Sequence, residues 1–260
     1  LESIYVWQFQ EFTPGGGGTF GGNNMVRNWV PFLTNVKDPA GKSGMVITDS
    51  MGRGVGSVRP SNYVLYDIWA DNWNNDMRNS VNNIRRSFIY TNPSSTYFGK
   101  PVEPKTSQED TLRNIYPIIR KVEGKPWENN NTTGRTTKDV MVYRLAETYL
   151  LRAEAYFRKG DSKDAADDIN AVRARAKASP VLPANVSFDY ILDERARELI
   201  TEEARRQTLT RMGKLVERVR KYNMMEITRA SIQDRNEFFP IPQSVIDANF
   251  SAKLEQNKGY

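Results

Sequence analysis

The sequence predicts a mostly α-helical fold, built on tetratricopeptide-like helical hairpins with long loops and a few short strands. Two observations predict this fold class. Apolar residues follow a helical period from residue 139 onward, whereas the region before it is rich in Gly, Asn, Pro and aromatic residues. We therefore divide the chain into a loop- and aromatic-rich region over 1–138 and a helical scaffold over 139–260, and we expect them to form one structural unit.

The clearest pattern in the scaffold is a helical hairpin over 143–176. Gly160 can end its first helix in the left-handed conformation that a side chain would resist. Asp161 or Ser162 can then accept the free amide hydrogens at the start of the second helix, and Pro180 lies just beyond its end. The residues expected on the inner face of the first helix are Val142, Leu145, Ala146, Tyr149, Ala153, Tyr156 and Phe157.

The hairpin is similar to a single tetratricopeptide repeat of about 34 residues. Repeat solenoids generally need about three units to bury a continuous core, so we interpret this one as scaffold; a hairpin that grips a peptide is the alternative. We expect it to pack against a third helix over 189–212. The tail at 238–242 (FFPIP) contains two prolines and is predicted to pack on the helices as extended chain.

The region before residue 139 is predicted to contain only short elements. These are strands over 4–9, 45–48 and 115–122, and helical pieces over 63–73 and 77–84. We interpret Trp69 and Trp73 as packing residues, whereas Trp127 stands beside a polar loop and could be exposed. Asp76 and Arg78 are expected to hold a turn through a salt bridge or hydrogen bonds.

The composition excludes several kinds of chemistry and partner. The chain has neither Cys nor His, which rules out disulfides, thiol nucleophiles, zinc fingers and His-based catalytic triads. The net charge is +6, but Lys and Arg are mixed with Asp and Glu, which predicts a solvated surface and no nucleic-acid partner. No apolar run approaches the roughly 18 residues that are needed to span a bilayer.

The arrangement of carboxylates argues against catalysis. Glycoside hydrolysis needs two carboxylates that face each other across a sugar, one of them with a raised pKa. Here Glu194, Glu198 and Glu202 follow one another at i, i+4 on a single helix among arginines, which predicts ion pairs. The glycine runs at 15–18 and 52–56 also lack the features of a phosphate loop. We therefore predict no catalytic residue, no metal ligand and no cofactor, with the question of a bound Ca²⁺ left open.

Several short motifs follow one another in a characteristic order. They are DMR (76–78), RLAE (144–147), YLLRAEAY (149–156), ILDER (191–195), PIP (240–242) and QNKGY (256–260). This succession resembles the carboxy-terminal half of the SusD/RagB family, most clearly over 141–260. Glu203, Thr208 and Lys258 stand where Gly, Asp and Pro are common in the family, and these departures affect only local caps and turns.

The resemblance implies a SusD-like α/α superhelix and a surface-exposed, non-catalytic lipoprotein of a bacterial outer membrane. Such a protein binds a glycan nutrient, or in some members a peptide, and delivers it to a SusC-like TonB-dependent transporter. The lipid anchor and most of the helical repeats would lie in an amino-terminal half outside this chain, so we expect this half to be only marginally stable alone. The alternative is a protein-interaction scaffold without a small ligand.

The candidate ligand-binding residues lie in the first part of the chain. Sugar sites pair aromatic platforms, which contact C–H faces, with polar side chains that bind hydroxyl groups. Family sites are an arc of aromatic residues, some of them from loops in this region. By position, the candidates are Trp29, Trp7, Tyr5, Arg27 and Asn28. Tyr5 and Trp7 share one face of the predicted strand, a pattern that is also typical of core residues.

Overall fold

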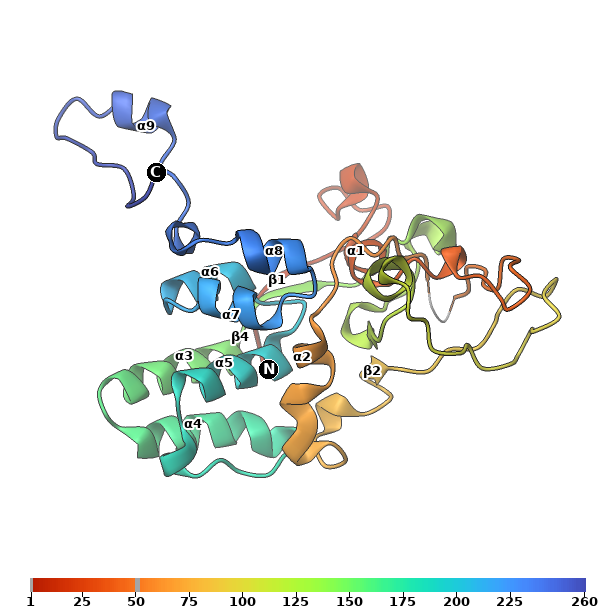
Figure 1. Cartoon of the computed structure of the whole chain (residues 1–260), viewed down its shortest axis with the longest axis horizontal. Helices are drawn as coiled ribbons and strands as arrows, with labels where there is room; N and C mark the ends of the chain where they lie inside the picture. The colour runs from red at the N-terminus through yellow and green to blue at the C-terminus, as the bar shows by residue number, and fades with distance from the viewer. Residues whose placement is uncertain (1, 50–51) are drawn as a thin grey trace. The chain divides into compact units, whose positions relative to one another are not determined.

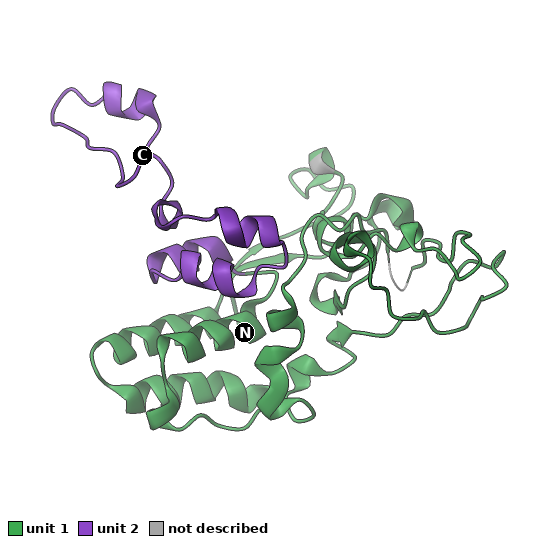
Figure 2. Cartoon of the chain, in the orientation of Figure 1, with its two compact units in different colours: residues 1–202 green, residues 203–260 purple. Residues whose placement is uncertain are grey.

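The computed structural model describes residues 2–49 and 52–260. Their fold is mostly helical, as predicted (Figure 1). The chain divides into two compact units, which Figure 2 distinguishes by colour: a larger unit of residues 1–202 and a smaller unit of residues 203–260. Within the described residues, every helix is too short or too polar to cross a bilayer.

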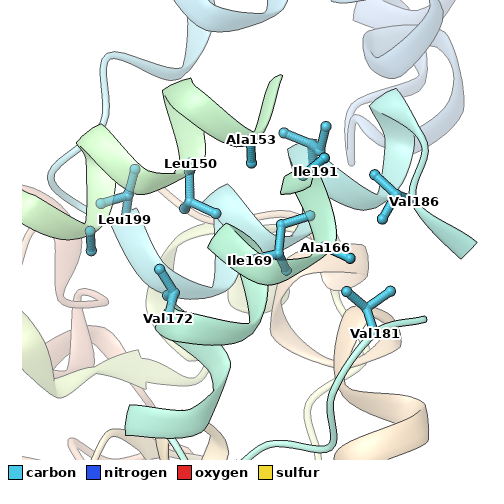
Figure 3. Close-up of a cluster of buried hydrophobic side chains, with 11 residues drawn as sticks. Leu150, Ala153, Ala166, Ile169, Val172, Val181, Val186, Ile191 and Leu199 are labelled. Atoms are coloured by element: carbon cyan, nitrogen blue, oxygen red, sulfur yellow. The ribbon is translucent and has the colours of Figure 1, made fainter. Parts of the chain in front are cut away.

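The predicted hairpin is present in the larger unit. It consists of α3 (Leu145–Arg158) and α4 (Ser162–Arg175), and α5 (Phe188–Leu199) packs against both. The turn has the predicted chemistry, because Gly160 has a φ of 85° and the Asp161 carboxylate accepts a first-turn amide N–H at 3.0 Å. Apolar side chains of the three helices form one core (Figure 3), whose most buried members include Leu150, Ala153, Ala166, Ile169 and Ile191.

The scaffold begins with a strand, which corrects the prediction of helix from residue 139. β4 (Val140–Arg144) pairs with β1 (Ser3–Trp7) in an antiparallel two-stranded sheet, and β1 confirms the first predicted strand. Val142 therefore lies in a strand rather than on the inner face of α3, and Leu145 is 42% exposed at the start of that helix. The β-branched and aromatic residues of VMVYR favour a strand once β1 supplies a hydrogen-bonding partner.

The third helix, predicted as continuous over 189–212, is interrupted. After α5 the chain leaves the helical conformation, and Thr201 has a φ of 70°. The next helix, α6 (Arg205–Arg211), belongs to the smaller unit. In the intervening turn the Glu202 carboxylate binds Arg144 at 2.6 Å, a tertiary contact that helical periodicity does not reveal.

Short elements joined by long loops make up most of the rest of the larger unit. They are η1 (Gly18–Phe20), α1 (Met25–Trp29), η2 (Leu33–Asn35), α2 (Asn62–Leu65), η3 (Asp67–Asn72), η4 (Met77–Asn79), β2 (Ile84–Arg85), η5 (Asp110–Asn114), β3 (Ile118–Ile119), η6 (Arg120–Val122), η7 (Trp127–Asn129), η8 (Asn131–Thr133) and η9 (Pro183–Asn185). Helices α2 and η3 confirm the helical pieces predicted over 63–73.

Three of the predicted short elements are wrong in extent or in type. Over 77–84 only the first turn, η4, is helical, and over 115–122 only the two residues of β3 form a strand, which pairs with β2. Residues 45–48 are not a strand. There the Val46 amide N–H donates to the Thr91 hydroxyl at 3.0 Å, so a loop side chain takes the place of a neighbouring strand.

The smaller unit contains α6, α7 (Leu215–Tyr222), α8 (Glu226–Ser231), η10 (Asp234–Glu237) and α9 (Gln243–Asp247). Its FFPIP tail is extended. The Gln256 side chain binds both the N–H and the C=O of Ile241, at 2.7 and 2.8 Å. The Arg206 guanidinium of α6 lies 4.1 Å from the centroid of the Phe239 ring, so a helix and the end of the chain both hold the tail.

A glycine repeat holds a loop against α1. The Val55 N–H donates to the carbonyl oxygen of Arg27 at 2.8 Å, and the Gly56 N–H donates to that of Val30 at 3.0 Å. A Cβ added at Gly54 would lie only 2.0 Å from the Val30 oxygen. The glycines at 52–56 therefore let the backbone of this loop approach the backbone of α1 closely, and the contact holds α1 in place.

We predict that Gly54→Ala destabilises the larger unit by about 1–3 kcal/mol, because backbone atoms must move to admit the methyl group. Gly18→Ala is the matched control, since a Cβ there would meet no atom within 4 Å. Urea unfolding of both variants measures the difference. Equal stability of Gly54→Ala and the parent chain would contradict the close contact.

Candidate functional site

The predicted ligand-binding residues fall in two places in the larger unit. Tyr5 and Trp7 lie on β1, and Arg27, Asn28 and Trp29 lie on α1. One stretch of chain touches both places. Its residue 136 forms a β-bridge with residue 23, just before α1, and its residue 140 pairs with Trp7. Four residues span at most about 14 Å, so the backbones beside the two groups are close neighbours.

The β1 rings are exposed to solvent. Tyr5 is 50% exposed and Trp7 is 54% exposed, so neither is a core residue. The Trp7 indole Nε1–H donates to the Tyr5 hydroxyl at 3.1 Å, which shows that the two side chains share one face, as predicted. Beyond Trp7, the Phe9 N–H donates to the Asp139 carboxylate at 2.9 Å and holds the end of the strand in place.

The α1 residues are less accessible. Asn28 is exposed, whereas Arg27 and Trp29 are half-buried. The Arg27 Nη1 donates to the carbonyl oxygen of Thr133 at 3.2 Å, and the Trp29 ring packs against an apolar cluster around Val30. These contacts occupy part of the guanidinium and part of the indole, so the β1 rings offer the larger free aromatic surface.

One ring beside this site was missed by the sequence analysis. Tyr143 on β4 is 57% exposed, and its ring centroid lies 6.5 Å from that of Tyr5. The residue was assigned to the start of a helix. The β-branched and aromatic residues in VMVYR were the available signal for a strand.

The remaining tryptophans do not contribute an obvious platform. Trp127 is buried, which corrects the expectation of an exposed ring; it packs against Gly22, where a Cβ would lie 2.6 Å from the indole. Trp69 is buried as predicted. Trp73 is 42% exposed, and the Arg86 guanidinium lies 4.7 Å from its ring, consistent with a packing role.

The predicted turn and ion pairs form one buried cluster. Arg78 binds Asp76 at 2.7 Å, which confirms the turn, and it also binds Glu194 at 2.8 Å and Glu198 at 2.9 Å. Arginines from β4, α4 and α5 complete the cluster. Arg144 and Arg175 form salt bridges with Glu198, and Arg173 and Arg197 form salt bridges with Glu194.

The cluster is built for charge pairing rather than for acid catalysis. Burial opposes the ionisation of Glu194 and Glu198, but the surrounding arginines outweigh it and lower the pKa of both carboxyls. A glycosidase acid needs the opposite shift. A cavity of about 550 Å³ lies beside the cluster, and each cation that lines it already pairs with a carboxylate.

The larger unit thus combines a helical hairpin with a two-stranded ribbon that carries exposed aromatic rings. A family model described as the SusD family matches residues 58–260. The chain belongs to the SusD family.

A curated protein is similar to this chain in sequence, and solved structures are similar to it in fold. Starch-binding protein SusD from Bacteroides thetaiotaomicron is 34% identical over 143 residues, which cover 52% of this chain and 25% of SusD. Surface glycan-binding protein A from Bacteroides thetaiotaomicron aligns with a TM-score of 0.59 at 21% identity, over 99% of this chain and 52% of that protein. Its complex with laminarihexaose aligns with the same TM-score and identity, over 98% of this chain and 52% of that protein. Surface glycan-binding protein A from Bacteroides fluxus aligns with a TM-score of 0.57 at 22% identity, over 100% of this chain and 51% of that protein. The chain thus spans about half the length of these solved proteins, and the part of it that matches SusD covers a quarter of SusD.

We predict that Glu194→Gln lowers the free energy of unfolding at pH 7 by about 3–5 kcal/mol, because it leaves buried arginines without a counter-charge. Folding lowers the pKa of both glutamates below the ordinary value of 4.5, so their ionised forms stabilise the fold fully at pH values above 4.5. This stabilisation is lost as the pH falls through the lowered pKa values of the folded state. The variant should therefore lose less stability than the parent chain below about pH 4.5.

Urea unfolding at several pH values measures both effects. Asp167→Asn is the control, because this carboxylate is exposed and pairs with Lys163 at the surface, where solvent screening leaves an ion pair little effect on stability. If the stability of Glu194→Gln and of the parent chain changed in parallel with pH, the buried cluster would not be the source of the pH-dependent stabilisation.

Proposed function

We propose that the chain binds glycan at the cell surface without catalysis and delivers it to a SusC-like TonB-dependent transporter in the outer membrane. The observation that carries the proposal is the exposed pair of rings on β1, Tyr5 and Trp7, fixed to each other by an indole-to-hydroxyl hydrogen bond. The ring faces suit sugar C–H groups, and the ring edges suit hydroxyls. Trp29, with Arg27 and Asn28 beside it, would contribute a second contact from α1.

The family relationship supports this ligand class. SusD is named for binding starch, and a solved relative holds laminarihexaose. A peptide ligand and a protein-interaction scaffold without a small ligand remain the other candidates. The β1 rings favour the glycan, because they project an aromatic surface whose polar groups are uncharged, whereas a peptide site also needs partners for amide groups along an extended backbone.

We predict that Trp7→Ala weakens glycan binding at least about tenfold, which corresponds to about 1.4 kcal/mol. The change removes half-exposed aromatic surface without opening a core cavity, so the melting temperature should stay close to that of the parent chain. Affinity gels with starch and laminarin, followed by calorimetry on the polysaccharide that is retained, measure the loss. Trp29→Ala should weaken the same binding less, because its ring is partly covered.

Trp73→Ala is the matched control, since it removes the same residue type at similar exposure but from a ring that Arg86 covers. Unchanged glycan binding by both Trp7→Ala and Trp29→Ala would refute the site. Release of reducing ends would show an enzyme, and binding of a transporter but of no glycan or peptide would show a scaffold.

A further inference from the structure

The pairing of β1 with β4 contains two irregularities that compensate each other. Ser3 pairs with Arg144, Tyr5 with Tyr143, and the next residue of β1 with Met141. Each strand therefore carries one extra residue, first β1 and then β4. A shift of one residue moves a side chain to the opposite face of a sheet. The second bulge restores the register, and between the two bulges Tyr5 and Tyr143 lie directly opposite each other.

The buried ion-pair cluster fixes the direction of Tyr143. The next residue, Arg144, is buried; its Nη1 donates to Glu198 at 2.6 Å and its Nε donates to Glu202 at 2.6 Å. Neighbouring residues of a strand point to opposite faces, so an anchored Arg144 holds the Tyr143 ring outward. The Leu145 N–H donates to the carbonyl oxygen of Glu2, the residue just before β1, at 2.8 Å and closes the same end of the ribbon.

Three rings consequently follow one another in contact on this face: Tyr143 lies across the ribbon from Tyr5, and Trp7 lies beside Tyr5 along β1. We call this series of contacts the row. The Tyr143 and Tyr5 rings are stacked with an angle of 28° between their planes, and Tyr5 in turn accepts the hydrogen bond from Trp7. About half of each residue is exposed. The indole N–H is already donated to Tyr5, and none of the three side chains is charged, so the rings offer stacking surface and no counter-charge to a sulfate or carboxylate.

We infer that Tyr143 is a further glycan-binding residue and that the row of Tyr143, Tyr5 and Trp7 binds consecutive residues of one neutral oligosaccharide. This inference rests on the proposed function and extends that site onto β4, the strand that begins the scaffold. The mutual contacts fix the rings before ligand arrives, which lowers the entropy lost on binding. A ligand too short to reach from Trp7 to Tyr143 gains nothing from the third ring, so its contribution depends on chain length.

The test compares long and short ligands on variants of the whole 260-residue chain. Tyr143→Val keeps a residue that suits a strand but removes the ring, and Tyr143→Phe keeps the ring but removes the hydroxyl. Calorimetry uses laminarihexaose and maltohexaose, each beside its disaccharide. For the hexaose that the parent chain binds, Tyr143→Val should weaken binding roughly three- to tenfold, the size expected for one aromatic contact. Binding of the disaccharide should stay within about twofold, and Tyr143→Phe should bind both ligands nearly as the parent does.

The outcomes separate this inference from the proposed function. If Trp7→Ala weakens hexaose binding and Tyr143→Val does not, the glycan site stands and the third ring is refuted. An equal loss for hexaose and disaccharide, or an equal loss for Tyr143→Phe and Tyr143→Val, also overturns the row of stacking rings. If the parent chain binds neither hexaose, both proposals fall. Thermal unfolding of each variant shows whether a loss of hexaose binding comes from the missing ring or from an unfolded ribbon. If the Tyr143→Val chain no longer unfolds cooperatively, the ring has a structural role and the inference is refuted.

Discussion

Two glutamates one turn apart on α5 hold the larger unit together. Glu194 and Glu198 are almost fully buried, and they bind arginines from the turn at Arg78, from β4 and from α4. These segments are remote in sequence, so the pairs join the loop-rich front region to the helical hairpin. A buried charge is tolerable only while its partners are in place, since the loss of one leaves the others unneutralised. Most helices of the front region have six residues or fewer and would not be stable alone, which makes them dependent on such tertiary contacts.

The same cluster explains how a two-stranded ribbon can present rings in a fixed arrangement. An isolated pair of strands is marginally stable in water. Here β4 runs directly into α3, and its last residue, Arg144, is tied to Glu198 and Glu202. β1 then pairs with a strand that is already anchored. The α1 residues are fixed by a different device, the close backbone contact at Gly54. The two groups of candidate residues therefore stand on separate supports, and damage to one support need not disturb the other.

The parts of the fold that the sequence predicted well are those with local signals. Gly160 and Asp161 mark the hairpin turn through their own backbone and capping chemistry, and the i, i+4 spacing of glutamates among arginines indicated ion pairs. Features that depend on remote partners were beyond such reasoning. β4 needs β1, more than a hundred residues away, and Trp127 is buried because Gly22 leaves room for its ring. For the site, residue types and a shared strand face identified Tyr5 and Trp7. Their exposure, the partial burial of Trp29 and the neighbouring Tyr143 follow from packing.

Adjacent residues at the end of β4 have opposite roles, and this separates recognition from stability. Arg144 faces inward and cannot change without leaving Glu198 short of a partner, whereas Tyr143 is 57% exposed and stacks with Tyr5. Substitution at the outward position alters the surface that a ligand meets at small cost to folding, because surface changes away from buried pairs usually shift stability by less than about 0.5 kcal/mol. One scaffold can thus carry different ring patterns on the same ribbon, and under the proposed function the choice among glycans would follow from which outward positions of β1 and β4 carry a ring.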